Sequence, residues 1–150
     1  MDKYALKQYI TDKIGAKYVV PLIGVWEDID DVNFEKLPQK FAIKVNWGDG
    51  ERFGFIVKDK EKADIDFIKS QLSDRLQPWQ NGYYHSFFWG YKNVKPKIIA
   101  EEYIEQPDGK LNDYKLYCYN GKHKHTLICT DRDTKTRYIN MDCLLYTSPS

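Results

Sequence analysis

The stretch that most constrains the fold is residues 41–57, FAIKVNWGDGERFGFIV, in which a glycine-rich loop separates two β-rich segments. In the first segment, apolar residues alternate with Lys44, so a strand would place this lysine on the face opposite the apolar side chains. The apolar residues are Phe41, Ile43 and Val45. The sequence therefore predicts strand, loop and strand, with one cation on the polar face just before the loop.

The loop after this strand contains Gly48, Gly50 and Gly54, and glycine tolerates the positive φ angles of a tight turn. An ammonium group beside exposed loop N–H groups suits a polyphosphate, because both favour negatively charged oxygens. An ordinary hairpin with a surface lysine is the simpler interpretation of the stretch by itself. A phosphate site is the functional alternative.

Composition excludes several classes of protein. The chain has 150 residues, a formal net charge of +1 and 42% hydrophobic residues, as expected for one domain or a large part of one. The charge balance predicts no nucleic-acid partner. No apolar run is long enough to span a membrane and the first residues do not form a signal peptide, so a cytoplasmic location is expected. Cys118, Cys129 and Cys143 lack metal-site spacing and are expected to be reduced thiols.

Two helices are predicted. Asp2 is placed to cap a helix that ends at Gly15, with an apolar face formed by Leu6, Tyr9, Ile10 and Ile14. The second, in residues 58–77, carries a buried stripe of Ile65, Ile68, Leu72 and Leu76. Between them, residues 17–26 are extended in character. The acidic run 27–31 is expected to be a solvated loop that leads to a short helix.

An aromatic segment, residues 78–96, follows the second helix and has no clear period. Exposed aromatic rings can stack on a sugar or a base. The commoner role of such rings is to pin a long loop onto its domain, and this role is expected here. The alternative is a carbohydrate-binding module, whose contact residues would be Tyr83, Tyr84, Phe87, Phe88, Trp89 and Tyr91.

Three further strands are predicted after the aromatic segment, at residues 97–104, 113–119 and 123–132. Asn120, Gly121 and Lys122 between the last two indicate a tight hairpin turn. His123 and His125 would share one face of a regular strand, but no third metal ligand accompanies them, and a basic surface patch is the favoured interpretation. The final residues, 143–150, break the pattern and resemble translated adapter sequence, so we expect the natural chain to diverge near Asp142.

The order of these motifs resembles the ATP-grasp fold, and within it the TupA-like branch that is linked to teichuronopeptide and surface-polysaccharide biosynthesis. The resemblance is carried by PLIGVW, LPQKFAIKVNWGDG, WGYKNVKPKIIAEEYI and DYKLYCYNGK with a following Asp-Arg. It implies an α+β fold, with two small antiparallel sheets and flanking helices around a nucleotide cleft. The implied segments are 1–40, a first lobe 41–96, a hinge and start of a second lobe 97–142, and a non-native tail 143–150.

The resemblance also implies a nucleotide site. A lysine at the position of Lys44 contacts the phosphates, and the loop 47–54 closes over them. Backbone groups of Glu102 and Ile104 pair with the edge of adenine, and a carboxylate reaches the exocyclic amine or the ribose. The implied binding residues are Lys44, Trp47, Gly48, Asp49, Gly50, Glu101, Glu102, Tyr103, Ile104, Asp113 and Lys115.

Strand alternation leaves two questions about these residues open. Glu101 and Glu102 point to opposite faces, and alternation does not decide which of the two faces the nucleotide. Asp113 and Lys115 share a face that would line the cleft, while Tyr114, Leu116 and Cys118 would face a core. The alternative for Asp113 and Lys115 is a surface ion pair that contributes little to stability.

The chain departs from the family pattern in two ways. Members of this branch often carry His-Gly-Ser-Gly where this chain has Trp47, Gly48, Asp49 and Gly50. The Asp49 charge is unfavourable beside phosphate unless a metal or Arg52 offsets it. The acidic and asparagine ligands for Mg²⁺ belong to later strands, which would follow Asp142. The chain is therefore expected to be a C-terminally truncated enzyme, without metal ligands or an assigned catalytic residue of its own.

The function implied by the resemblance is that of an ATP- and Mg²⁺-dependent ligase. The intact enzyme would phosphorylate a carboxylate and join it to an amine, or act on a sugar acceptor, during cell-surface polymer synthesis. The alternatives are the carbohydrate-binding module and a glycosyltransferase-like protein of a polysaccharide gene cluster. The sequence identifies neither the acceptor nor the oligomeric state.

Overall fold

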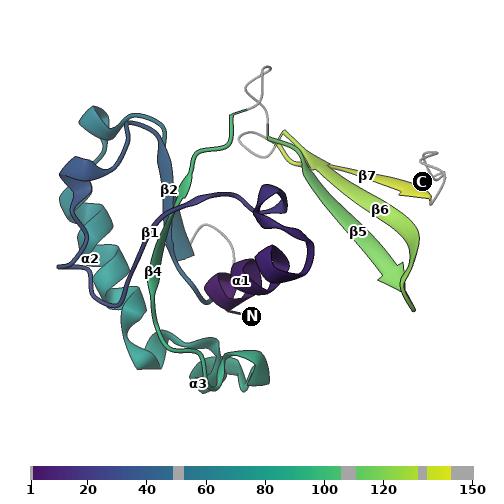
Figure 1. Ribbon diagram of the computed structural model, residues 1–150, viewed down its shortest axis with the longest axis horizontal. Coiled ribbons are helices and arrows are strands. Elements are labelled where there is room, and N and C mark those ends of the chain that lie inside the picture. Colours follow the sequence, from purple (N-terminus) through teal and green to yellow (C-terminus); the bar gives the residue numbers. More distant parts are fainter. Residues whose placement is uncertain (1, 49–52, 106–110, 132–134, 143–150) are drawn as a thin grey trace. The chain divides into compact units, whose positions relative to one another are not determined.

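The computed structural model describes residues 2–48, 53–105, 111–131 and 135–142. The predicted tail 143–150 lies outside these residues. The chain forms two compact units, Met1–Tyr103 and Ile104–Ser150, and divides within the segment expected to be the hinge. Both units contain a small antiparallel sheet, and the helices belong to the first, which gives the α+β class expected from the sequence (Figure 1).

The sheet of the first unit is antiparallel, with strand order β1-β4-β2-β3. Its strands are β1 (Leu22–Trp26), β2 (Phe41–Val45), β3 (Gly54–Val57) and β4 (Ile98–Glu102). In the register, Ile43 lies opposite Phe55 on β3 and Ala100 on β4. β2 is thus a central strand, hydrogen-bonded to both neighbours.

One face of this sheet carries the core. Phe41, Ile43 and Val45 are fully buried, as the alternation predicts. They pack with Ile68 and Leu72 of helix α2 (Ile65–Leu76), so the predicted buried stripe is confirmed. The helix is shorter than predicted, because Asp64 accepts a hydrogen bond from the Phe67 N–H and starts a new helix there. Residues 60–62 form a separate 3₁₀ turn.

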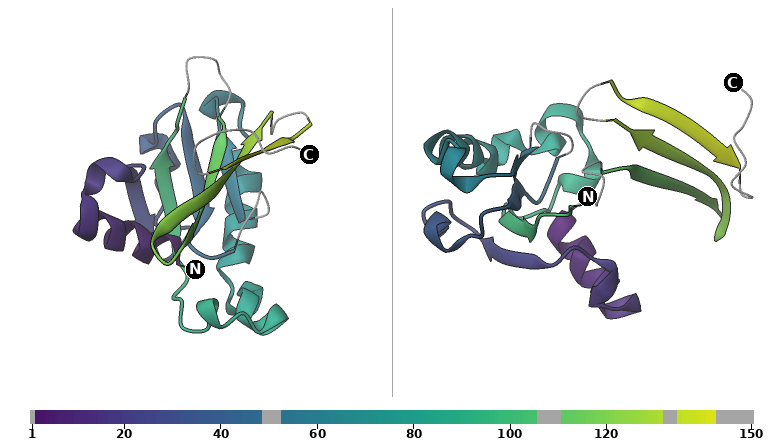
Figure 2. Two further views of the ribbon diagram at one scale, coloured as in Figure 1. Left: turned by 90° about the vertical axis from the view of Figure 1, so that its right-hand side faces the viewer. Right: turned by 90° about the horizontal axis from the view of Figure 1, so that it is seen from above.

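Helix α1 (Lys3–Ile14) lies on the other side of the sheet from α2 (Figures 1 and 2). Asp2 caps it by accepting from the N–H groups of Tyr4 and Ala5, and Gly15 ends it at a φ of 107°. The predicted caps are confirmed, but the predicted apolar face is wrong. Tyr9 and Ile14 are 61% and 59% exposed, and no residue of α1 is buried. Polar contacts, described below, hold this helix in place.

The aromatic segment pins its loop onto the core in part, since Tyr91 and Val94 pack against the core cluster. It forms the short helix α3 (Gly82–Ser86) and 3₁₀ turns on either side of it, at Pro78–Gln80 and Trp89–Tyr91. Phe87 is 76% exposed and Trp89 70%. Other rings of the segment contact one another, for example Tyr83 with Trp89 at 5.8 Å between ring centroids.

The second unit is a sheet of β5 (Asp113–Tyr119), β6 (Lys122–Thr130) and β7 (Arg137–Asp142), in that order. Asn120 and Gly121 both have positive φ, which confirms the tight turn predicted between β5 and β6. The expected apolar core face is not buried, since Tyr114 is 55% and Leu116 63% exposed. Cys118 and Cys129 are free thiols, as expected, and only Cys129 is buried.

Candidate functional site

Lys44 projects from the sheet face opposite the core, as the alternation in β2 predicts. Its neighbours Ile43 and Val45 are fully buried, whereas the Lys44 side chain is 29% exposed. The strand thereby holds its charged residue at the surface of the first unit, directly before the glycine loop.

Glu101 of β4 reaches Lys44 across the sheet. Ala42 lies opposite Glu101 and Lys44 opposite Ile99, so Lys44 and Glu101 are diagonal neighbours on the same face. The Lys44 Nζ lies 2.5 Å from the Glu101 Oε2. This settles which carboxylate shares the face of Lys44: Glu101 does, at 5% exposure, while Glu102 is exposed on the other side.

A second ammonium group binds the same carboxylate. The Nζ of Lys7, on α1, lies 2.9 Å from the Glu101 Oε1 and donates to the Val20 carbonyl at 2.7 Å. The side chains of Lys7 and Glu101 are 14% and 7% exposed. Burying a carboxylate this deeply is costly unless opposite charges accompany it. Two lysines from separate elements meet that requirement, and the group of three carries one net positive charge.

Asn46, at the end of β2, connects α1 to the sheet. Its side chain is fully buried and satisfied: Nδ2 donates to Asp2 Oδ1 at 3.0 Å and to the Lys95 carbonyl at 2.9 Å, while Oδ1 accepts from the Lys97 N–H at 2.9 Å. The Lys3 N–H donates to the Asn46 carbonyl at 2.8 Å. The N-terminus of α1 is therefore fixed to the start of the glycine loop.

The start of the glycine loop is held by the Lys3 side chain, which binds backbone carbonyls. The Lys3 Nζ donates to the carbonyls of Trp47, at 2.9 Å, and Gly48. The Trp47 side chain is 1% exposed and packs in the core, where its indole N–H donates to the Arg75 carbonyl. A nucleotide contact by Trp47 would therefore involve its backbone. Gly48 has a φ of 73°, consistent with the turn predicted there. Asp49 and Gly50 lie outside the described residues.

The segment after Glu101 contributes backbone groups and one ring. The Glu102 N–H donates to the Pro21 carbonyl at 3.0 Å, so this N–H is not available to an adenine in this conformation. Tyr103 is partly buried, and the Lys40 Nζ lies 5.8 Å from the centre of its ring. Ile104 is 45% exposed.

Asp113 and Lys115 belong to the second unit, where they form an ion pair of 2.6 Å on β5.

The prediction that His123 and His125 share one face of their strand is wrong. A bulge in β6 places His125 opposite Tyr117 but His123 opposite Cys118, so the two rings lie on opposite faces. His125 stacks on Tyr117, and the His123 Nε2 is 2.8 Å from the Thr126 Oγ1.

Among the described residues, no group of three or more His, Cys, Asp and Glu side chains is arranged to hold a metal ion.

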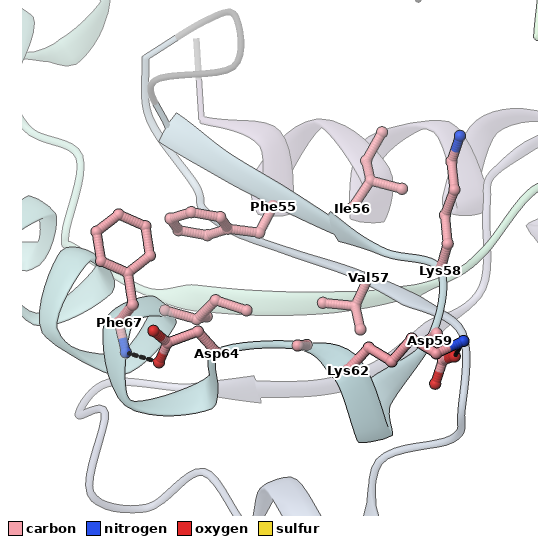
Figure 3. A pocket seen from close by; sticks show the side chains of 10 residues that line it. Phe55, Ile56, Val57, Lys58, Asp59, Lys62, Asp64 and Phe67 are labelled. Atoms are coloured by element: carbon pink, nitrogen blue, oxygen red, sulfur yellow. Dashed lines mark hydrogen bonds and ion pairs between the residues drawn. The ribbon is translucent and has the colours of Figure 1, made fainter.

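A cavity of about 320 Å³ lies between β3 and the start of α2, lined among others by Phe55, Val57 and Phe67 (Figure 3). A cavity of about 490 Å³ lies beside Lys7, along α1 and residues 19–22. Neither is lined by Lys44.

Sequence reasoning missed three contributors to this site: Lys3, Lys7 and Asn46. Lys3 and Lys7 are four residues apart, so they lie on the same face of α1, and this spacing was the available signal. This signal is weak by itself, because lysines are common on the solvated face of a short helix. The role of Asn46 depends on Asp2 and on residues 95–97, which are distant in the sequence.

A comparison with protein families places the chain in one of them. The family described as TupA-like ATPgrasp matches residues 1–145, and the chain belongs to this family. It is thus of the general ATP-grasp type, a class of ATP-binding, ligase-type proteins. Searches of curated proteins and of solved structures gave no significant match. In the part of the chain that the structure describes, no helix is long and apolar enough to cross a membrane.

Proposed function

We propose that this chain binds ATP, supplied as its magnesium complex, with Lys44 as a phosphate contact. The observation that carries the proposal is the Lys44–Glu101 pair of 2.5 Å, formed on the face opposite the core and directly before the glycine loop. In the structure, the Lys44 ammonium neutralises the Glu101 carboxylate. A phosphate oxygen can replace that partner, because both are oxygen anions that accept from the same donor.

Glu101 is the carboxylate best placed for the adenosine part of the nucleotide. Of the two candidates in the segment, it is the one on the face of Lys44, and it is held by ammonium groups on both oxygens. An ionised carboxylate accepts hydrogen bonds, which suits an exocyclic amine or a ribose hydroxyl. Backbone contacts to adenine are proposed for the Glu102 carbonyl and for Ile104. The roles proposed for Asp113 and Lys115 rest on the family resemblance.

The reaction proposed for the parent enzyme is phosphorylation of a carboxylate by ATP, followed by its joining to an amine in cell-surface polymer biosynthesis. The family membership supports the ATP-dependent ligase class. Magnesium would offset the charge of the transferred phosphoryl group. The described residues provide no cluster for the metal, so we assign no ligand to it.

Calorimetric titration of the chain with ATP and Mg²⁺ tests the proposal. We expect saturable binding, which Lys44→Met weakens at least about tenfold, because a charge contact in a partly buried site is lost. The matched control is Lys36→Met, an exposed lysine of the same unit. Failure of the unmodified chain to bind ATP would reject the proposal, and equal affinity in Lys44→Met would remove the phosphate role.

The carbohydrate-binding alternative retains one supporting observation. The aromatic segment exposes large rings, among them Phe87 at 76%, Trp89 at 70% and Tyr84 at 62%. Exposed rings of this kind stack on sugar faces. A glycan array separates the two functions: glycan binding that survives Lys44→Met but is lost in Trp89→Ala, without any effect of nucleotide, would favour the module.

A further inference from the structure

One buried carboxylate, Glu101, joins two lysines, of which Lys7 lies near the start of the first unit's sequence and Lys44 near its middle. Lys44 binds Oε2 at 2.5 Å and Lys7 binds Oε1 at 2.9 Å. Side-chain exposure rises from Glu101 at 7% through Lys7 at 14% to Lys44 at 29%. An anion arriving from solvent therefore meets Lys44 more readily than Lys7, and Glu101 is the most buried of the three side chains.

The charges of this group decide how well it attracts an anion. Lys44 and Glu101 alone would form a neutral pair, which has little attraction for phosphate. Lys7 restores one net positive charge, and in a partly buried group this charge is weakly screened. The Val20 carbonyl accepts from the Lys7 Nζ at 2.7 Å and fixes the ammonium on its side of the carboxylate.

We propose that Lys7 is a positioning residue of the phosphate site, which holds the Glu101 carboxylate and thereby leaves Lys44 able to bind a polyphosphate. This inference rests on the proposed function and adds a residue of helix α1 to it. When phosphate binds Lys44, the Glu101 charge remains compensated by Lys7 rather than being left alone in a buried position. Lys7 thus acts through Glu101 and does not itself have to touch the nucleotide.

Titration calorimetry of the full chain with tripolyphosphate, and separately with ATP and Mg²⁺, tests this role. We expect Lys7→Met to weaken the binding of both by about tenfold, because the group loses its net charge. Lys7→Arg should restore most of the affinity, since it keeps the cation. Lys13→Met, on the same helix at an exposed position, is the matched control and should bind as the unmodified chain does.

A double variant separates charge from structure. Lys7→Met together with Glu101→Gln again leaves one net positive charge, on Lys44. The affinity for tripolyphosphate should therefore return to within about threefold of that of the unmodified chain. The salt dependence of binding should also return to that of the unmodified chain. If Lys7 only holds α1 in place, the double variant will bind no better than Lys7→Met. Urea unfolding of each variant identifies any that fails to fold, and Lys7→Arg and the double variant then carry the test.

The outcomes distinguish this inference from the function on which it rests. Absence of ATP and tripolyphosphate binding by the unmodified chain overturns both. Binding that Lys44→Met weakens and Lys7→Met leaves unchanged overturns only the role of Lys7. Weakening by Lys7→Met that is reversed by arginine and by the double variant supports it.

Discussion

The two units of this chain are both small antiparallel sheets, yet they are stabilised very differently. In the first unit, one sheet face is covered by α2 over fully buried residues such as Phe41, Ile43 and Leu72. In the second, the described residues that are buried are Thr126 and Cys129 alone. Hydrogen-bonded strand ladders are thus present in both units, but among the residues that the structure describes only those of the first unit form a hydrophobic core. The comparison therefore predicts that strand pairing and core formation contribute separately to stability.

Removing a core side chain should expose this difference most strongly. Leu72→Ala is expected to lower the free energy of unfolding by about 2–5 kcal/mol, because it leaves a cavity in the first unit. Leu116→Ala in the second unit should change it by less than about 0.5 kcal/mol, since that side chain is 63% exposed. Urea denaturation measures both. A large effect of Leu116→Ala would mean that its face is covered in solution.

Asn46→Ala should have the next largest effect. It removes the partner of Asp2, of the Lys95 carbonyl and of the Lys97 N–H in a fully buried position, which is expected to cost about 2–3 kcal/mol. Asn140→Ala on the exposed strand β7 is the control in the second unit and should be nearly neutral. Equal urea midpoints for the two variants would contradict the linking role of Asn46.

Two glycines with the same backbone angle compare the surroundings of the two units directly. Gly48 and Gly121 both have a φ of 73°, but a Cβ on Gly48 would lie 2.4 Å from the Phe53 ring, whereas one on Gly121 would meet nothing within 4 Å. Gly121→Ala should cost about 1 kcal/mol of backbone strain, and Gly48→Ala more. Hydrogen exchange of the neighbouring amides measures each locally. A larger cost for Gly121→Ala than for Gly48→Ala would show that the Phe53 ring moves away readily.

The smallest effect is expected from a surface ion pair. The Lys97 ammonium donates a hydrogen bond to Glu27 and, together with its charge, holds the pKa of that carboxyl below its ordinary value of 4.5. A carboxyl with a lowered pKa stabilises the fold above its unfolded pKa, and the contribution is lost as the pH falls through the folded pKa. Glu27→Gln should therefore differ slightly from the unmodified chain at pH 7 and not at all in acid below that folded pKa, as measured by urea midpoints. A difference that persists in acid would rule out the carboxylate charge as its source.

Much of the fold was predictable because its signals are local. Asp2 and Gly15 mark the ends of α1, and the alternation around Lys44 fixed which face that lysine occupies. The predicted apolar face of α1 failed because helical spacing does not say whether another element covers a face. The histidine prediction failed because a bulge changes the strand period, and no residue type announced it.

The candidate site was only partly predictable for a related reason. Lys44 and Glu101 follow from motifs within one strand each, but their pairing depends on the register of β2 against β4. Lys7 contacts Glu101 at the other end of the first unit's sequence, and Asn46 contacts Lys95, which is also distant in the sequence. Contacts of this kind are set by tertiary packing, which a single sequence does not display.

The bridge from Lys7 to Glu101 has a consequence for the order of folding. Helix α1 is synthesised before the sheet of the first unit, whereas β4 is the last strand of that sheet to be made. Closing so long a stretch of chain carries a large entropic cost, so contacts of this separation form slowly. The charged group at Glu101 should therefore be completed late, and a nascent chain that ends before β4 would have Lys7 and Lys44 without the carboxylate that joins them.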